Sequence, residues 1–243
     1  CEPFIGGGAV LFALQPENVI INDINSELIG VYQAIKDNVD ALIKRLEQFE
    51  NTKECFYDVR GWDRNAEFYN QLTDIDKAAR VIFLNKTCYN GLYRVNSAGE
   101  FNTPFGRYKN PNIVNENTLR AVNEYFNTAD VTILNTSYSE AVQGLPENSF
   151  VYLDPPYDPI SVTASFTGYN AGGFNRQDQI ALRDCCRQLD ANGIKFMLSN
   201  SATEFIQDIY SDFNITIVPA KRAINSVGSK RGCVDEVVVR NYE

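Results

Sequence analysis

The sequence predicts an α/β protein in which both ends of the chain form a mostly parallel sheet, interrupted by an inserted helical lobe. Three observations predict this class. Apolar runs of 4–6 residues, with no polar alternation, occur from residue 131 onward, as in strands that are buried on both faces. Helical stretches separate the later runs, which is the usual arrangement of parallel strands. Between residues 26 and 114, by contrast, the pattern is helical and then irregular.

The first element is a short strand at 18–23, "NVIIND", which ends in an acid. Ser26 is a suitable N-cap for the helix that follows, whose apolar residues recur with helical spacing to about Phe49. Residues 53–84 also have a helical pattern, and "KAARVIFLN" is their most apolar part. The sequence therefore predicts a helical lobe directly after the first strand.

Residues 87–112 have a different composition, rich in Gly, Asn, Pro and aromatic residues. A turn signal at Asn96–Gly99 lies between two short strand-like arms and predicts a hairpin at about 87–109. The later elements are a helix near 115–127, strands at 131–134, 149–153, 194–199 and 214–218, helices near 176–190 and 203–210, and a final strand in "VDEVVVRNY". We therefore expect two domains, a core of residues 1–25 and 115–243 and a helical domain of residues 26–114.

The composition argues against several classes of protein. The chain has 243 residues, of which 44% are hydrophobic, enough for one core with an inserted lobe. No apolar run approaches the roughly 18–20 residues of a membrane span, so we expect no membrane partner. Histidine is absent and the six cysteines show no CxxC spacing. These absences argue against a metal site and against His-dependent catalysis, and they favour a reducing, cytoplasmic compartment.

The charge is unevenly distributed. The net charge of -9 argues mildly against a nucleic-acid partner. Two segments are nevertheless basic. Residues 86–109 contain four basic residues and one acid, whereas residues 219–232 contain four basic residues and no acid. Two solvated loops would explain this pattern equally well, so the charge alone leaves both interpretations open.

The segment "EPFIGGGAVLF" (2–12) places three glycines at a strand-to-helix turn. Glycines there allow the backbone to approach a ligand closely. Their spacing differs from the G-x-G-x-x-G of dinucleotide-binding folds, and a tight turn without a ligand is an alternative. Asp23 ends the next strand, where an acid commonly binds ribose hydroxyls. Together these features favour a nucleoside-containing cofactor at the carboxyl edge of the sheet.

The segment "VYLDPPYDP" (151–159) ends an apolar strand with an acid, two prolines and a tyrosine. Pro155 has a fixed φ, so its carbonyl can act as a fixed acceptor beside the Asp154 carboxylate. Two acceptors suit an NH2 group, and Tyr157 offers a flat face for a planar ring. A planar ring with an exocyclic amine is a nucleobase, and adenine fits directly. The alternative is a strand-terminating turn with a capping acid.

Five blocks of the sequence resemble the Dam-type DNA adenine-N6 methyltransferases, which have a Gly-rich motif before DPPY. The blocks are "EPFIGGGAVLF", "INDINSELI", "FLNKTCYNGLYRVNSAGEFNTPFGRYKNP", "VYLDPPYDP" and "KRAINSVGSKRGCVDEVVVRNY". They occur in the family's order and cover essentially the whole chain, although DPPY alone is only moderately specific. The resemblance implies a Rossmann-like methyltransferase sheet that binds S-adenosylmethionine, with an inserted helical DNA-recognition lobe. Family members begin with a Trp and a Gly-Gly-Lys that contact the cofactor, so we expect a similar segment before Cys1.

The resemblance also implies roles for individual residues around the cofactor and the target base. Asp23 would bind the ribose of S-adenosylmethionine, and Ile24 and Tyr138 would flank its adenine. The methionine side would be shaped by Phe4, Gly6, Gly7 and Gly8. The catalytic motif would be Asp154, Pro155, Pro156 and Tyr157, with Asp154 also beside the cofactor. Asp154 and the Pro155 carbonyl would hold N6 of an adenine that is flipped out of the duplex, and Tyr157 would stack on it. The methyl group would move in line from sulfur to nitrogen, without a covalent enzyme intermediate.

The hairpin would recognise the DNA sequence. By resemblance, Tyr89 inserts into the base stack, and the base-contacting positions are Asn90, Leu92, Arg94, Pro104 and Arg107. An arginine that binds guanine O6 and N7 is the commonest contact in the major groove, and the implied site is 5'-GATC-3'. The implied phosphate contacts are Lys109, Lys221, Lys230 and Arg231. For residues 221–231, an ordinary solvated loop remains an alternative.

The sequence thus leaves three hypotheses. The first is a monomeric, cytoplasmic DNA adenine methyltransferase that recognises GATC, in a restriction–modification, phage or housekeeping role. The second is an amino-methyltransferase acting on cytosine N4, RNA or a glutamine side chain, against which the long hairpin argues. The third is a remnant that binds DNA without methylating it.

Overall fold

The structure is a computed structural model and describes residues 1–160, 173–221 and 233–243. The side chains at both ends of the 222–232 gap, at 220–221 and 233–234, are also outside the description. The predicted phosphate contacts Lys230 and Arg231 therefore lie outside the described residues, as does the side chain of Lys221. Within the described ranges, no helix is both long and apolar enough to cross a bilayer.

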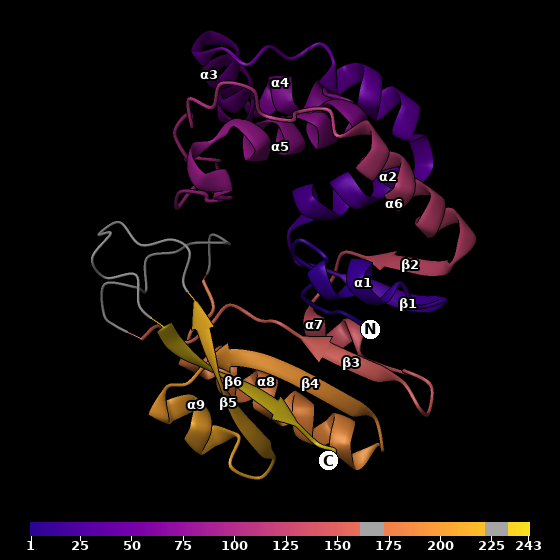
Figure 1. The fold of residues 1–243 in the computed structure, drawn as a ribbon, viewed down its shortest axis with the longest axis vertical. Coiled ribbons are helices and arrows are strands. Elements are labelled where there is room, and N and C mark those ends of the chain that lie inside the picture. Colours follow the sequence, from indigo (N-terminus) through magenta and orange to yellow (C-terminus); the bar gives the residue numbers. More distant parts are fainter. Residues whose placement is uncertain (161–172, 222–232) are drawn as a thin grey trace.

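Among the described residues, six strands form the sheet region, and all the predicted strands are confirmed. Figure 1 shows their arrangement. They are β1 (Asn18–Asn22), β2 (Asp130–Leu134), β3 (Phe150–Leu153), β4 (Lys195–Ser201), β5 (Asn214–Lys221) and β6 (Cys233–Arg240). Strand β1 pairs with β2 in parallel, and β3 pairs with β4 in parallel. Strand β6 lies between β4 and β5 and is antiparallel to both. The sequence had not predicted antiparallel pairing in this part of the sheet. Only residues 222–232 connect β5 to β6, too few for the crossover that a parallel pair needs.

The first two residues join the two groups of strands. The Cys1 amine donates to the Phe150 carbonyl of β3, and the Tyr152 amide donates to the Cys1 carbonyl. Glu2 bridges to Ile21 of β1 in parallel. The spatial order is therefore β2, β1, residues 1–2, β3, β4, β6 and β5. In such doubly wound sheets, ligands bind at the carboxyl ends of the strands where the strand order reverses. Here the order reverses at residues 1–2, which lie between β1 and β3.

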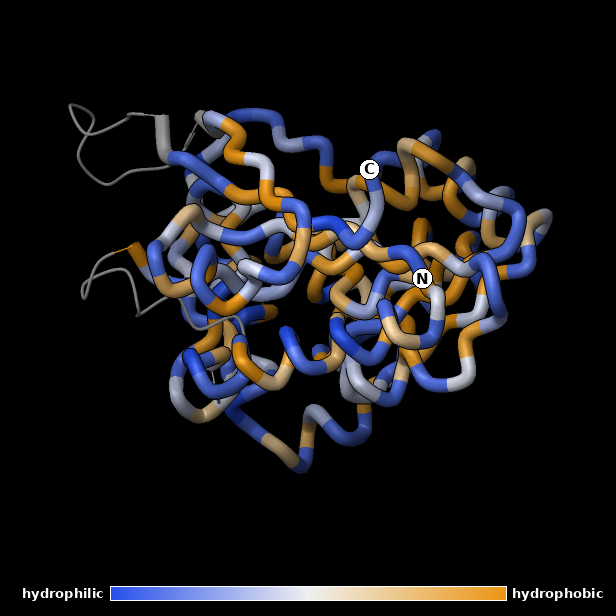
Figure 2. The backbone as a smooth tube through the Cα atoms, turned by 90° about the horizontal axis from the view of Figure 1, so that it is seen from below, coloured by the Kyte–Doolittle hydropathy of each residue, from blue (hydrophilic) through white to orange (hydrophobic). Residues whose placement is uncertain are grey.

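The helical lobe consists of α2 (Ser26–Leu46), α3 (Lys53–Gly61), η1 (Trp62–Arg64), α4 (Ala66–Gln71) and α5 (Asp74–Thr87). Helix α2 ends slightly before the predicted limit at Phe49. The helical pattern at 53–84 is confirmed as several short helices, because Asn65 and Thr73 cap new ones. The lobe has its own hydrophobic core, which includes Phe56 and Phe83. In Figure 2, hydrophobic stretches run through the interior and hydrophilic stretches dominate the periphery.

Helix α2 is kinked at Asn38, whose φ is -153° and ψ is 61°. Asn123 of α6 (Glu116–Thr128) donates to the carbonyls of Ile35 and Lys36 just before the kink. The side chain therefore satisfies acceptors that a kinked helix leaves without their usual partners. Ile29 and Tyr32, before the kink, pack with β1 and β2, whereas Leu42 and Leu46, after it, lie in the core of the lobe.

The remaining helices are α1 (Ala9–Leu14), η2 (Tyr89–Gly91), α7 (Tyr138–Ala141), α8 (Arg176–Ala191) and α9 (Glu204–Ile209). Leu182 and Cys186 of α8 and Ile206 of α9 pack on Leu198 of β4 and Val237 of β6 in one buried cluster. Helices α8 and α9 therefore pack on β4, and this packing fixes the strand that leads into the loop at its carboxyl end.

Candidate functional site

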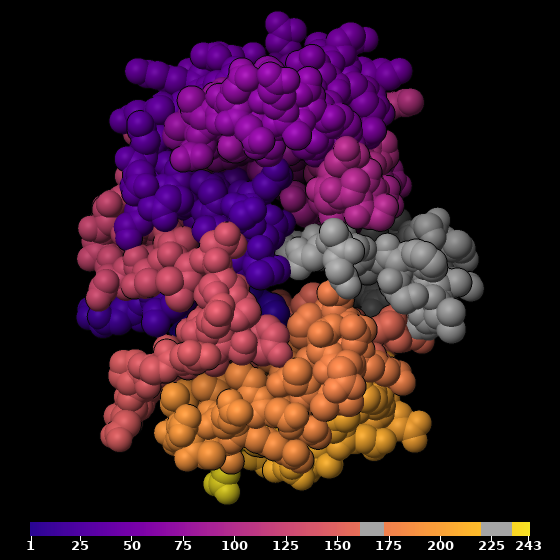
Figure 3. Space-filling view, turned by 180° about the vertical axis from the view of Figure 1, so that it is seen from behind, coloured from indigo at the N-terminus to yellow at the C-terminus, as the bar shows by residue number. Residues whose placement is uncertain are grey.

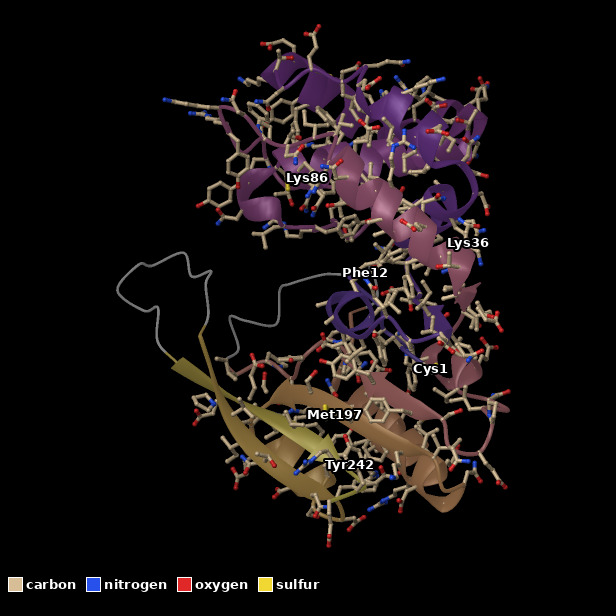
Figure 4. The ribbon with its side chains drawn as sticks, turned by 45° about the vertical axis from the view of Figure 1, so that its right-hand side comes forward. Cys1, Phe12, Lys36, Lys86, Met197 and Tyr242 are labelled. Carbon is tan, nitrogen blue, oxygen red and sulfur yellow. The ribbon has the colours of Figure 1, made fainter. Side chains whose placement is uncertain are left out.

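The glycine-rich turn lies at the carboxyl end of β1. Gly6 and Gly8 have φ values of +47° and +68°, which side-chain-bearing residues rarely adopt. A Cβ on Gly8 would lie 2.7 Å from a ring carbon of Phe12, which is labelled in Figure 4. A Cβ on Gly7 would meet no atom within 4 Å. Gly6 and Gly8 are thus required by the backbone, whereas Gly7 faces open space.

Asp23 connects this turn to the start of α2. Its carboxylate accepts hydrogen bonds from the Gly6 amide at 3.2 Å and from the Asn25 amide at 2.9 Å. Asp23 is only 4% exposed, whereas the next residue, Ile24, is 57% exposed. Asn25 in turn caps α2 by accepting from the Glu27 and Leu28 amides. The predicted ribose-binding acid is therefore held rigidly at the mouth of the turn, with an exposed apolar side chain beside it.

Phe4 and Tyr138 stack on each other. Their ring centroids are 5.2 Å apart and the rings are inclined by 27°. Phe174 contacts both rings edge-on, with centroid distances of 6.0 and 6.3 Å. Burial is the main cause that raises the pKa of Tyr138 to about 12. Phe174 was not predicted from the sequence, because a single aromatic residue beside "GG" carries no distinctive pattern.

The DPPY loop, residues 154–158, follows β3. Asp154 is exposed, and the Ser199 hydroxyl of β4 donates to its Oδ1 at 2.7 Å. The Pro156 carbonyl accepts from Gln179 Nε2 at 2.8 Å. Within the described part of the chain, no donor reaches Asp154 Oδ2 or the Pro155 carbonyl. Both acceptors predicted for a target amine therefore lack a donor among the described residues, and Asp154 is exposed whereas Pro155 is buried.

Buried amides support this loop from behind. Asn200 Oδ1 accepts from the Asp158 amide at 2.9 Å, and Asn200 Nδ2 donates to Gln179 Oε1 at 3.1 Å. Both amide side chains are fully buried. Asp158 also accepts from Thr203 at 2.8 Å and from Arg176 at 3.2 Å. These residues were not predicted from the sequence. The polar residues that end the apolar run "IKFMLSNS" could have indicated a site at that end of the strand.

Two further ionisable groups lie near Asp154. Burial raises the pKa of Tyr157, and the Asp154 charge adds to this rise. Glu2 is 7% exposed, and burial raises its pKa to about 7 from 4.5, with Asp154 again contributing. Glu2 was missed, although it is the only acid in the glycine-rich motif.

The predicted hairpin, residues 87–109, is present with the predicted turn. The Asn96 amide donates to the Glu100 carbonyl at 2.9 Å, and Gly99 has a φ of +81°. The arms pair only at isolated bridges, Val95 with Phe101 and Cys88 with Phe105. A Cβ on Gly106 would lie 2.7 Å from the Cys88 carbonyl oxygen, so this glycine allows the two backbones to approach each other.

The side chains predicted to contact DNA are exposed on the hairpin. Tyr89 is 55% exposed and Leu92 is 38% exposed. The other exposed positions are Asn90, Arg94, Pro104, Arg107 and Lys109. Arg94 donates to Asn102 Oδ1 at 2.7 Å, and none of the three cations belongs to an ion pair with another described residue. Lys86 (labelled in Figure 4) and Lys109 line an open depression beside Tyr108. From behind, in Figure 3, this part of the lobe faces the C-terminal half of the chain.

A buried arginine anchors the hairpin to the lobe. Arg80 is fully buried and pairs with Glu27 at 3.2 Å and with Asp63. Asp63 also accepts from the Phe101 amide at 2.9 Å, and Phe101 is itself buried. Arg60 donates to the Thr103 carbonyl at 3.1 Å. The backbone of the hairpin is thus fixed, although many of its side chains are exposed.

Comparison with known proteins identifies the family. Residues 1–224 match the model of the D12 class N6 adenine-specific DNA methyltransferases. The chain is 44% identical over 243 residues to the type II methyltransferase M1.LlaDCHI of Lactococcus lactis subsp. cremoris, covering 99% of this chain and 85% of that protein. It is also 44% identical over 257 residues to the type II methyltransferase M.MjaIII of Methanocaldococcus jannaschii, covering 99% and 87%. The DNA adenine methylase of Escherichia coli K12 is 32% identical over 245 residues, covering 98% and 84%. The chain therefore belongs to the D12 class of N6 adenine-specific DNA methyltransferases.

Proposed function

We propose that the protein transfers a methyl group from S-adenosylmethionine to N6 of an adenine within 5'-GATC-3' in double-stranded DNA. The arrangement of the DPPY loop carries the proposal. Among the described residues, no donor reaches Asp154 Oδ2 or the Pro155 carbonyl, and both lie at the carboxyl end of β3, beside the point where ligands of such sheets bind. An exocyclic amine has two hydrogens, one for each acceptor.

The residues around the glycine-rich turn fit the cofactor. Open space at Gly7 leaves room for a ligand near the backbone. Asp23 is held at the turn by the Gly6 and Asn25 amides, and a carboxylate is an acceptor that suits ribose hydroxyls. Ile24 and the Phe4–Tyr138 pair offer apolar surface for an adenine ring and the methionine chain. When bound, S-adenosylmethionine supplies an electrophilic methyl group on sulfur.

The chain's own groups hold the target amine. An adenine inside a duplex cannot reach Asp154, so it must rotate out of the stack, and Tyr157 offers a flat face on which it rests. The hydrogen bond from N6 to Asp154 draws the nitrogen lone pair away from the ring and aims it. The nitrogen–methyl bond would form as the sulfur–methyl bond breaks, which leaves a neutral thioether, and the proton that N6 loses would pass to solvent beside the exposed Asp154. No covalent bond to the enzyme is needed.

The hairpin supports sequence recognition. Exposed arginines without a carboxylate partner can donate two hydrogen bonds to guanine O6 and N7, and Arg94 and Arg107 are both of this kind. Tyr89 and Leu92 are exposed apolar groups that can enter the base stack.

Lys86 and Lys109 suit phosphate contacts. Lys221, Lys230 and Arg231 remain proposed phosphate contacts. Two relatives are named type II methyltransferases, which favours a restriction–modification role.

Three measurements test the proposal. Mass spectrometry of DNA nucleosides from cells that express the protein should find N6-methyladenine, and N4-methylcytosine alone would contradict the proposed reaction.

The same DNA should be cut by a nuclease that requires adenine methylation at GATC and should resist one that is blocked by it. N6-methyladenine at other sites only would contradict the proposed sequence. Salt-dependent DNA binding without heat from S-adenosylmethionine in calorimetry would support a non-methylating remnant instead.

A further inference from the structure

The Ser199 hydroxyl occupies a central position behind the DPPY loop. It donates to Asp154 Oδ1 at 2.7 Å and lies 3.4 Å from the Tyr152 hydroxyl. Ser199 is only 8% exposed. A buried hydroxyl thus contacts the carboxylate of the motif that faces a target base.

The hydrogen-bonding capacity of these groups orients the hydroxyl. A serine hydroxyl has one hydrogen and two lone pairs, whereas a carboxylate only accepts. The Ser199 hydrogen must therefore point to Asp154, and the Tyr152 hydroxyl meets a lone pair of Ser199 as the donor. With Oδ1 occupied, Asp154 offers Oδ2 to a substrate.

Ser199 itself stands on a rigid element. It pairs with Val238 of β6, and its neighbour Leu198 pairs with Leu153 of β3, so β4 is held on both sides. The next residue, Asn200, belongs to the buried amide network. Asp154, by contrast, is exposed at the start of a loop. An exposed carboxylate has several rotamers in reach, and methyl transfer needs one of them.

We propose that Ser199 is a positioning residue for methyl transfer, whose hydroxyl holds the Asp154 carboxylate with one oxygen toward the target amine. This inference rests on the proposed function. It assigns Ser199 no contact with the substrate, so its effect must pass through Asp154.

The chain contains a matched control for removing this hydroxyl. Ser201 lies on the same strand, is 1% exposed, and its hydroxyl has no hydrogen-bond partner among the described residues. Ser199→Ala and Ser201→Ala therefore delete the same atom from the same strand. Only the first deletion removes a contact with the DPPY loop.

The test is the single-turnover rate of methyl transfer to a GATC duplex, measured with the dissociation constants of the duplex and of S-adenosylmethionine. Ser199→Ala should lower the rate by about 10- to 100-fold, as expected when a reacting group is misplaced by a fraction of an ångström to an ångström. Both dissociation constants and the melting temperature should stay near those of Ser201→Ala. Ser199→Thr, which keeps the hydroxyl, should recover most of the rate.

Three results would overturn the inference. The rate of Ser199→Ala could equal that of Ser201→Ala. Its rate, affinities and melting temperature could fall together, which would indicate a structural role only. A folded Ser199→Thr could be as slow as Ser199→Ala. A wild-type protein that fails to methylate adenine would instead contradict the proposed function, so the two failures are distinguishable.

A double-mutant comparison tests whether Ser199 acts through Asp154. In the Asp154→Ala background the acceptor of the Ser199 hydroxyl is already lost, so removing that hydroxyl should change the residual rate by a much smaller factor. Equal factors in the two backgrounds would show that the residues act independently and would overturn the positioning role.

Discussion

The DPPY loop and the hairpin satisfy their polar groups in opposite ways. In the loop, buried side chains from β4 and α8 hold Asp154, Pro156 and Asp158. In the hairpin, the backbone is fixed through Arg80 and Asp63, but Arg107 and Lys109 have no ion-pair partner among the described residues. This difference fits the two proposed tasks, methyl transfer by the loop and DNA recognition by the hairpin. Methyl transfer needs fixed reacting groups, whereas DNA recognition needs free donors on a fixed backbone, ready to meet bases and phosphates.

The largest expected effect comes from removing the anchor of the hairpin. Arg80→Leu leaves Asp63 and Glu27 without their buried partner, so the free energy of unfolding should fall by about 3–5 kcal/mol. Urea denaturation measures this change. Arg120→Leu is the control, because Arg120 pairs with Asp40 and Glu116 on the exposed surface and its loss should hardly move the midpoint. Equal effects of the two variants would contradict the anchoring role of Arg80.

Asp154→Ala separates the chemical step from recognition. The rate of methyl transfer should fall by about 10²-fold or more, because the amine loses the acceptor that aims its lone pair. Affinity for the GATC duplex should change little, since the hairpin is untouched. Fluorescence anisotropy and single-turnover kinetics measure both quantities. A loss of duplex binding would instead show that Asp154 supports the structure of the interface.

Arg107→Ala tests the other side of the comparison. Loss of a bidentate contact to guanine should cost about 1–3 kcal/mol of specific binding and relax the preference at one base pair. Competition with duplexes that carry single substitutions measures this change. Equal weakening on all sequences would indicate a phosphate contact rather than base recognition.

Glu2→Gln probes the electrostatics beside Asp154. Burial holds the pKa of Glu2 at about 7 in the folded protein, above the ordinary 4.5. The folded state therefore keeps a proton that the unfolded state releases, and stability falls as the pH rises from about 4.5 to about 7. The Gln variant lacks this fall, so its advantage over the wild type in thermal unfolding should grow across that range. A constant difference between the two proteins at all pH values would contradict the raised pKa.

The sequence predicted the fold well because its elements leave local signals. Apolar runs mark the strands, the Asn96–Gly99 turn marks the hairpin, and helical spacing marks α2. The antiparallel direction of β6 left no such local signal. It depends on a partner strand and on a short connection, which become visible only in the sheet.

The supporting residues of the candidate site were harder to predict. Arg80, Ser199 and Gln179 are polar residues inside apolar or helical patterns, where they look like ordinary interruptions. Their partners are distant in the sequence: Asp63 is 17 residues from Arg80, and Asp154 is 45 residues from Ser199. The exposed groups in the motifs were predicted from residue type or from the family resemblance, but the groups that hold them required the tertiary structure.

We propose that the DPPY loop determines which group is methylated and that the hairpin determines at which DNA sequence. The most direct test is a single-base map of N6-methyladenine in DNA methylated by the wild type and by Arg107→Ala at equal total methylation. The wild type should modify GATC alone, and the variant should still form N6-methyladenine but spread to sites that differ from GATC at one guanine–cytosine pair. An Arg107→Ala map confined to GATC would contradict the claim.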